Sequence, residues 1–223
     1  RLAEMAARNN RDEAALRALK LQKSYARTTG ALKELAQALG LPAPPRRIEG
    51  YDISNTQGRQ SVGSMVVMLG GVLAPKEYRH FRIKTVEGAN DFQSMREVIF
   101  RRFSHGVAER AEREGQDLPA QGGKFSDLPD LVLIDGGPGQ LKEALGAMRE
   151  AGGDANMFGL AKRIEEIVLP DCDESILLDR HSPALHLIQR LRDEAHRFGI
   201  THHRKLRAKQ SISSSLDGIP GIG

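Results

Sequence analysis

The run of four apolar residues Leu131–Ile134 constrains the fold of this chain more than any other feature of its sequence. A strand with one solvated face alternates apolar and polar residues, whereas a strand covered on both faces carries an unbroken apolar run. The run ends at Asp135-Gly136-Gly137, and Pro138 fits the first position of a following helix. We therefore predict a buried strand and then a helix to about Ala151, in a sheet flanked by helices.

The remaining elements are predicted from hydrophobic period and turn residues. Three short β-rich runs, 46–54, 61–69 and 77–84, are separated by glycine-containing turns, so we expect an antiparallel meander. Further expected elements are a helix capped by Asn90 or Asp91, a strand at 156–161, a hairpin over 164–169 and 175–178, and a long helix capped by Ser182. Antiparallel strands followed by alternating strands and helices predict an α/β, ribonuclease-H-like mixed sheet.

A proline-rich segment, residues 41–45, divides the sequence. Before it, apolar residues recur at helical spacing from Leu32 to Leu39, and Gly40 lies just past the end of that stripe. Proline-rich runs favour stiff, extended geometry, so we place the main domain boundary there. We expect a helical segment and linker over residues 1–45 and one α/β domain over residues 46–210.

Charge is unevenly spread along the chain. Residues 1–47 carry ten Lys or Arg and four Asp or Glu, whereas residues 48–191 carry 17 basic and 22 acidic groups. This pattern fits a polyanion-binding protein whose centre gathers carboxylates for another purpose, although solvated, basic helix faces explain it as well. No apolar run approaches the roughly 20 residues of a membrane helix, so no membrane partner is expected. The single cysteine, Cys172, suits the reducing cytoplasm.

Two aspartates lie where the expected sheet positions ligands. Asp52 is inside the first β-rich run, and Asp135 follows the buried strand, at the end where open α/β sheets bind ligands. Each has a structural explanation when taken alone: a nearby Arg or backbone donors for Asp52, and a turn into Pro138 for Asp135. Together on neighbouring strands they would need a cation between them. Hard oxygen ligands select Mg²⁺ or Mn²⁺, ions that promote phosphodiester cleavage.

A third candidate ligand is His196, on the long C-terminal helix. Leu187, Leu191 and Ala195 mark the buried stripe of this helix, and His196 lies just off that stripe. Most exposed helical histidines have no such role, but an imidazole that reaches the two carboxylates would bias the site towards Mn²⁺. We expect Asp193 to orient the ring in that case.

Basic residues near the third β-rich run are candidate phosphate contacts. His80, Arg82 and Lys84 alternate on one side of that run, and Arg101 and Arg102 lie in the helix after it. A solvated sheet face explains these residues equally well. The chain has three Tyr, seven Phe and no Trp, so base stacking is not expected to dominate, and any nucleic acid would be held mainly by its backbone.

Several motifs, in order along the chain, resemble one family: the C-terminal endonuclease half of the C subunit of the bacterial UvrABC excision nuclease. The resemblance covers essentially the whole sequence. It is carried by Tyr51–Gly58, Val62–Val67, Tyr78–Lys84, Asp135–Leu141, Gly159–Arg163 and Arg192–Arg197. So many separate motifs in one order are far more specific than a single short match.

The resemblance implies a ribonuclease-H-like fold whose catalytic and metal-binding triad falls on Asp52, Asp135 and His196. It also implies Mn²⁺- or Mg²⁺-dependent incision of damaged double-stranded DNA on the 5′ side of a lesion, in nucleotide excision repair. The implied partner is the UvrB–DNA complex, met through parts of a longer protein, because neither a GIY-YIG nuclease nor a UvrB-binding motif is recognised here. Residues 211–223 resemble the start of a truncated helix-hairpin-helix module.

The leading hypothesis is a metal-dependent DNA endonuclease domain, with Lys84, Lys162 and Arg163 as predicted contacts to the DNA backbone. One alternative is a non-catalytic nucleic-acid-binding scaffold, because a fold does not by itself imply an activity. Another is a ribonuclease or junction nuclease on the same fold. Metal-dependent cleavage separates the enzymes from the scaffold, and RNA hybrids and branched DNA tested beside a lesion-bearing duplex separate the enzymes from each other.

Overall fold

The computed structural model describes residues 16, 20, 22, 24–54, 61–86, 88, 90–161, 165–170, 172 and 174–216, with the backbone alone for residue 203 and residues 205–216. The strands are β1 (Arg47–Ser54), β2 (Val62–Leu69), β3 (Val72–Leu73), β4 (Arg79–Arg82), β5 (Leu131–Ile134), β6 (Asn156–Ala161) and β7 (Glu166–Val168). The helical elements are η1 (Ala26–Gly30), α2 (Ala31–Ala38), η2 (Pro75–Glu77), α3 (Asp91–Gly115), α4 (Pro138–Glu150) and α5 (Pro183–Leu216).

Within these residues the strands form one mixed, seven-stranded sheet in the order β3-β2-β1-β5-β6-β7, with β4 also paired to β2. The antiparallel pairs of β1 with β2 and of β2 with β4 confirm the predicted meander. The strand β5 pairs in parallel with both β1 and β6, and every residue of β5 is buried, as its apolar run predicts. The predicted α/β mixed sheet is confirmed.

Two details of the sheet differ from the prediction. The short β3 was not predicted, because two residues are too few to show a hydrophobic period. The predicted hairpin is reduced to β7 and a single bridge between Ile167 and Ile176, and β7 also pairs with β6 along its length.

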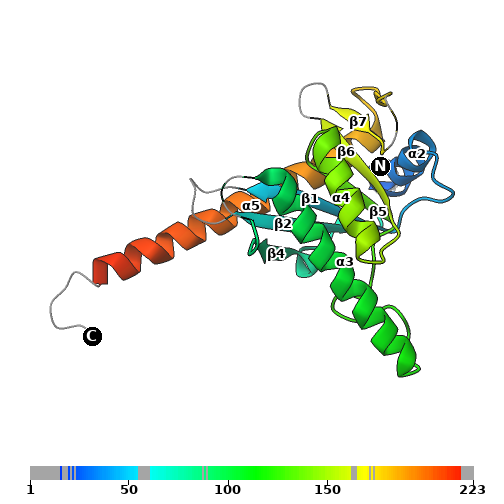
Figure 1. The fold of residues 1–223 in the computed structure, drawn as a ribbon. Helices are drawn as coiled ribbons and strands as arrows, with labels where there is room; N and C mark the ends of the chain where they lie inside the picture. The colour runs from blue at the N-terminus through cyan, green and yellow to red at the C-terminus, as the bar shows by residue number, and fades with distance from the viewer. Residues whose placement is uncertain are drawn as a thin grey trace, which may run out of the picture.

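Helices cover both faces of the sheet. The pair α3 and α4 packs on one face, and α5, with η1 and α2 against it, packs on the other (Figure 1). Two glycines on β1 and β2 allow this close packing. A Cβ at Gly50 would lie 2.9 Å from Leu191 of α5, and a Cβ at Gly63 would overlap Val98 of α3. The helix α5 therefore lies directly on β1.

The helices α3 and α5 begin at predicted capping residues. Asn90 Oδ1 accepts a hydrogen bond from Gln93 N at 3.1 Å, and Ser182 Oγ accepts one from Leu185 N at 3.1 Å. The Ser182 hydroxyl also donates to Glu34 of α2, which ties the N-terminal helical segment to the start of α5. From Pro183, α5 runs to Leu216 and projects away from the sheet (Figure 1). No helix in the described part of the chain is long and apolar enough to span a membrane.

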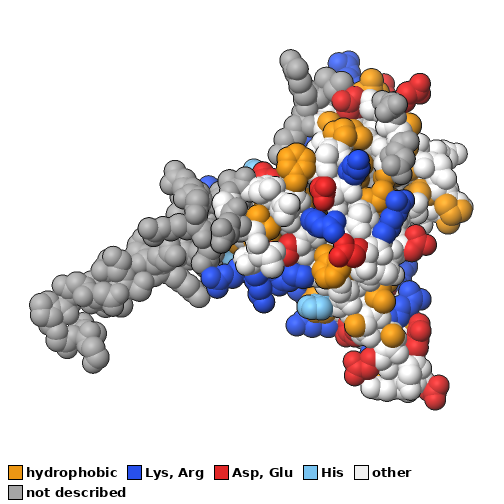
Figure 2. All heavy atoms as spheres, in the orientation of Figure 1, with side chains coloured by type: hydrophobic (Ala, Val, Ile, Leu, Met, Phe, Trp, Pro, Cys, Tyr) orange, Lys and Arg blue, Asp and Glu red, His pale blue; other side chains and the backbone are white. Residues whose placement is uncertain are grey.

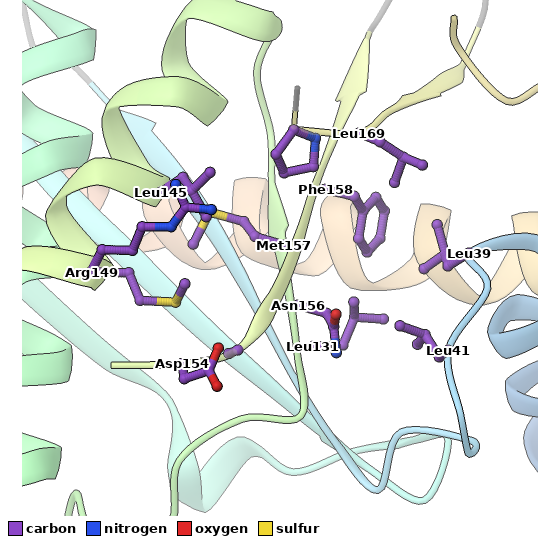
Figure 3. Close-up of a pocket in the computed structure, with 13 residues that line it drawn as sticks. Leu39, Leu41, Leu131, Leu145, Arg149, Asp154, Asn156, Met157, Phe158 and Leu169 are labelled. Atoms are coloured by element: carbon purple, nitrogen blue, oxygen red, sulfur yellow. The ribbon is translucent and has the colours of Figure 1, made fainter. Parts of the chain in front are cut away.

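A hollow of about 350 Å³, with both apolar and polar lining residues, lies where β5 and β6 begin (Figure 3). Leu131 and Asn156, the first residues of the two strands, line it together with Leu39, Leu145 and Phe158. Because Asp135 follows the last residue of β5, this hollow and the candidate carboxylates lie at opposite ends of the parallel strands.

Candidate metal centre

Asp52, Asp135 and His196 come together in the structure. Each offers one ligand atom, and these atoms all lie within 4.8 Å of one another. His196 Nδ1 lies 3.6 Å from Asp52 Oδ2. The convergence predicted from the sequence is therefore present, with the three residues contributed by β1, by the turn after β5 and by α5.

The two aspartates are neighbours because β1 and β5 pair in parallel. The register places Tyr51 opposite Ile134, and Asp135 N continues the ladder by donating a hydrogen bond to Tyr51 O at 3.0 Å. Asp135 is consequently held next to Asp52 by the backbone itself. Gly136 N then donates to Ile134 O at 2.9 Å, so the chain turns sharply before α4 begins.

The site has a buried side and an open side. The side chain of Asp52 is 6% exposed and that of His196 is 58% exposed, while Asp135 is buried. Two carboxylates thus form the floor of the site, and the imidazole stands at its rim.

Ser54 also belongs to the site, and the sequence analysis missed it. Its Oγ donates a hydrogen bond to Asp52 Oδ2 at 3.0 Å. Residues i and i+2 of a strand point to the same face, so the spacing of Ser54 from Asp52 was a usable signal. Opposite Asp52 on β2 is Ser64, which is fully buried and whose Oγ has no hydrogen-bond partner among the described residues.

The prediction that Asp193 orients the His196 ring is wrong. Its carboxylate accepts hydrogen bonds from Arg192 Nε at 3.0 Å and from Arg192 Nη2 at 2.8 Å, so it faces its neighbour in sequence instead of the imidazole. The Asp52 carboxylate is the group that lies beside His196 Nδ1.

The structure also contradicts the prediction that Arg102 could contact phosphate, because Arg102 is fully buried. Its Nη2 and Nε donate to Glu49 at 2.7 and 3.1 Å, and the same carboxylate accepts from Arg47 Nε at 2.9 Å and from the Tyr51 hydroxyl at 2.6 Å. Burial alone would raise the pKa of Glu49, but the charges of Arg102 and Arg47 hold this pKa below its usual value. Arg102 therefore cannot contact DNA phosphate.

Of the three predicted contacts to the DNA backbone, the structure describes Lys84. Lys84 is exposed and follows β4, and its backbone N donates to Glu97 of α3 at 3.0 Å. Because Ser54 pairs with Val62 and Val62 with Arg82, Arg82 lies about 10 Å from Ser54 across two strands, and Lys84 follows two residues later at the same end of the sheet. Figure 2 shows basic side chains gathered along this β4 edge. Lys162 and Arg163 lie outside the described residues.

His80 is partly buried and serves packing more than phosphate contact. Its ring stacks on Phe198 of α5, with centroids 3.8 Å apart, and on His202, with centroids 4.0 Å apart. The stack holds α5 against β4 next to the candidate site. Arg82, two residues along, is exposed.

The geometry and donor chemistry suit a divalent cation. Ligand atoms about 2.1 Å from an ion lie about 3.0 Å apart when adjacent and about 4.2 Å apart when opposite in an octahedron. The 3.6 Å between Asp52 and His196 lies between these values, so small side-chain shifts would complete a shared coordination shell. Two carboxylates and one imidazole fit Mn²⁺, and Mg²⁺ through the carboxylates.

The family model of the UvrC RNAse H endonuclease domain matches residues 36–200. The chain belongs to this family. It is 48% identical over its full length to the UvrABC system protein C of Dehalococcoides mccartyi strain BAV1, and 47% identical over its full length to that of Symbiobacterium thermophilum. It covers 35% and 37% of those proteins, so the chain spans about a third of the length of the curated relatives that it matches.

Among solved structures, the chain is similar to Ciona intestinalis endonuclease V in complex with a 24mer DNA that contains an inosine followed by a ribo-adenosine. The identity is 11% and the TM-score is 0.41, with 80% of this chain and 97% of that chain covered. A likeness this distant does not bear on the function of this chain.

Proposed function

We propose that this chain is a divalent-metal-dependent DNA endonuclease domain that makes the 5′ incision at damaged DNA in nucleotide excision repair. One observation supports the proposal most directly. Asp52, Asp135 and His196 converge to within 4.8 Å from three separate elements, in a chain that belongs to an endonuclease family. Asp52, Asp135 and His196 would be both the metal ligands and the catalytic residues.

The chain's own residues have distinct roles in this proposal. A bound Mn²⁺ or Mg²⁺ would supply the activation of water and the stabilisation of charge on the leaving oxygen. Asp52 and Asp135 would hold the ion from the buried side, and the Ser54 hydroxyl would fix the orientation of the Asp52 carboxylate. His196 would complete the site from its exposed rim, on the side from which a phosphodiester enters.

The substrate and partner in this proposal are damaged double-stranded DNA and the UvrB–DNA complex, with UvrB met through parts of a longer protein. The names of the relatives support this, because they are components of a UvrABC system. Lys84, Lys162 and Arg163 are proposed to contact the DNA backbone. The division into residues 1–45, 46–210 and 211–223, and the cytoplasmic location, likewise stay predictions.

The metal site is tested first by anomalous diffraction from crystals of this chain soaked in MnCl₂. We expect a peak within about 2.5 Å of ligand atoms from Asp52, Asp135 and His196. A peak bound to other residues, with this triad empty at a saturating concentration, would contradict the assignment.

The activity is tested with this chain as part of the longer protein that meets UvrB, supplied with UvrB and with a duplex that carries one lesion and a label at its 5′ end. We expect a product cut on the 5′ side of the lesion in Mn²⁺ or Mg²⁺ and none in EDTA. Preferred cutting of an RNA hybrid or a branched DNA would instead identify a ribonuclease or a junction nuclease. DNA binding without cleavage under every condition would leave the scaffold as the function.

A further inference from the structure

Two arginines from distant parts of the chain lie against each other on the side of α5 that faces β3. Arg190 of α5 donates a hydrogen bond from Nη2 to the backbone O of Arg27 in η1, at 2.9 Å. The half-buried guanidinium of Arg190 is therefore held in place by the N-terminal helical segment. Arg27 is exposed, and its own guanidinium is free to reorient towards a ligand.

No carboxylate of the described residues lies within ion-pair distance of either guanidinium. Burial and the neighbouring charge of Arg27 both lower the pKa of Arg190, as expected for two cations without an anion between them. Asp193 is the acidic side chain nearest along α5, and Arg192 already engages its carboxylate. The pair thus carries positive charge that the described part of the chain does not neutralise.

A hollow lies on each side of the pair, and both arginines line both hollows. One, of about 420 Å³, is also lined by His186 and Asp193. The other, of about 440 Å³, is also lined by Lys20 and by the β2–β3 turn. Lys20 adds a third positive charge, so the surface offers a concave, basic site large enough for a phosphate group.

The wall of the second hollow is built by close packing. Gly71, in the β2–β3 turn, has a φ of +83°, and a Cβ there would lie 2.8 Å from the Thr28 Cα. The N-terminal segment therefore sits tightly on the turn, and Thr28 Oγ1 is anchored to Ser24 O at 2.8 Å. The basic site is consequently formed by the fold, from η1, the β2–β3 turn and α5 together.

We propose that Arg27, Arg190 and Lys20 form a binding site for two backbone phosphates of the DNA strand, separate from the metal centre. A guanidinium presents a planar fork of donors that matches phosphate oxygens, which favours phosphate over other anions. Arg190 precedes His196 by six residues of α5, about 9 Å along the helix axis. The proposal rests on the proposed function, because it takes DNA as the ligand.

The test is the salt dependence of DNA binding, measured by fluorescence anisotropy with a labelled lesion-bearing duplex in EDTA, where no cleavage occurs. The variant is Arg27→Gln/Arg190→Gln. Its matched control is Arg149→Gln/Arg110→Gln, which removes the same charge from exposed sites on α4 and α3, on the opposite face of the sheet. Each lost phosphate contact should lower the slope of log K against log salt by about 0.9, so the site variant should lose about 1.8 and the control nothing.

Two outcomes would overturn the proposal. Equal slopes for the site variant and the control would show that only the overall charge matters. A titration with inorganic phosphate alone, at constant ionic strength, provides the second arm. If the site variant loses phosphate binding but keeps the wild-type DNA slope, the site takes a free phosphate and the DNA assignment is wrong.

Two further measurements separate a failure of this site from a folding defect and from a failure of the proposed function. Arg27→Gln alone removes only an exposed side chain, so it keeps the test valid if the Arg190 substitution prevents folding; its expected loss of slope is about 0.9. Incision by the wild-type chain reports on the metal centre and does not depend on the slope. Cleavage with an unchanged slope would refute this site alone, whereas a changed slope without any cleavage would refute the proposed function alone.

Discussion

The two faces of β1 carry carboxylates with different neighbours. On the α3 face, Glu49 is fully buried and accepts hydrogen bonds from Arg47, Arg102 and Tyr51. On the α5 face, Asp52 lies beside a second carboxylate, Asp135, and its one ion-pair partner among the described residues is an imidazole. Glu49 has two guanidiniums as counter-ions, whereas Asp52 and Asp135 offer their ligand atoms next to each other and to an imidazole.

This difference separates a structural charge from a functional one. A buried carboxylate that is matched by two guanidiniums contributes to a unique packing and offers nothing to a ligand. Two carboxylates side by side repel each other, and a divalent ion between them relieves that repulsion. Breaking the Glu49 cluster should therefore change stability, and breaking the Asp52 cluster should change activity.

The largest effect is expected for Asp135→Asn. Incision should fall by at least about 10³-fold, equivalent to about 4 kcal/mol of activation free energy, because a metal ligand loses its charge. The free energy of unfolding, measured in urea without metal, should stay level or rise, since one of two adjacent negative charges is removed.

Asp130→Asn is the matched control for Asp135. Asp130 precedes β5, at the other end of the strand, and its Oδ2 accepts hydrogen bonds from the backbone N of Arg46 and Arg47, both at 2.8 Å. This variant should keep wild-type incision. Normal incision by a folded Asp135→Asn variant would remove Asp135 from the site.

The opposite pattern is expected for Glu49→Gln. Unfolding in urea should show a loss of about 3–5 kcal/mol, because Arg102 stays buried without its counter-ion. The molecules that remain folded should bind Mn²⁺ as the wild type does. Glu114→Gln breaks an exposed pair with Arg110 and should change the unfolding free energy by less than about 1 kcal/mol. If the two variants are equally stable, the Glu49 cluster is not a structural charge.

A smaller effect is expected for Ser54→Ala. Without the hydroxyl that orients Asp52, the affinity for Mn²⁺, measured by calorimetry, should fall by about 10- to 100-fold. Ser64→Ala is the control, because Ser64 faces Asp52 across the strand pair but makes no hydrogen bond among the described residues. Equal affinities of the two variants would show that the hydrogen bond from Ser54 does not orient the carboxylate.

The smallest effect is expected for the unfolding free energy at acidic pH. The pKa of Glu49 in the folded chain lies below its ordinary value of 4.5, so this group stabilises the fold at higher pH. That contribution is lost as the pH falls from about 4.5 through the folded pKa. Between pH 3 and 6, the unfolding free energy of the wild type should therefore fall more steeply on acidification than that of Glu49→Gln. Parallel pH profiles would mean that Glu49 is not the group responsible.

Local patterns in the sequence predicted the sheet and three candidate ligands, and the resemblance to a family grouped those candidates into a triad. The unbroken apolar run of β5 fixed a buried strand, and the residue after such a strand lies at its carboxyl end, which located Asp135. The antiparallel runs located Asp52, and the apolar stripe of α5 located His196 at the edge of its buried face. Each inference needed only the period of one element.

Contacts between elements were harder to predict. Arg102 lies at helical spacing from Met95, Val98 and Ile99 and so belongs to the buried stripe of α3, but its charge and its neighbour Arg101 made it look like a surface residue. Its partner Glu49 is 53 positions away, and no sequence period connects them. The prediction for Asp193 was wrong for the opposite reason. Its partner Arg192 is its neighbour in sequence and engages the carboxylate that was expected to orient His196.

The alternation along β1 also bears on how the chain folds. A shift of one residue in the pairing of β1 would turn Glu49 and Tyr51 towards α5 and Asp52 towards α3. Arg102 would then be buried opposite glycine and aspartate positions that do not supply its fork of hydrogen bonds, and the mispaired sheet would be several kcal/mol less stable. The native pairing of β1 completes the cluster around Glu49 and also brings Asp52 and Asp135 together, whereas a shift of one residue would do neither.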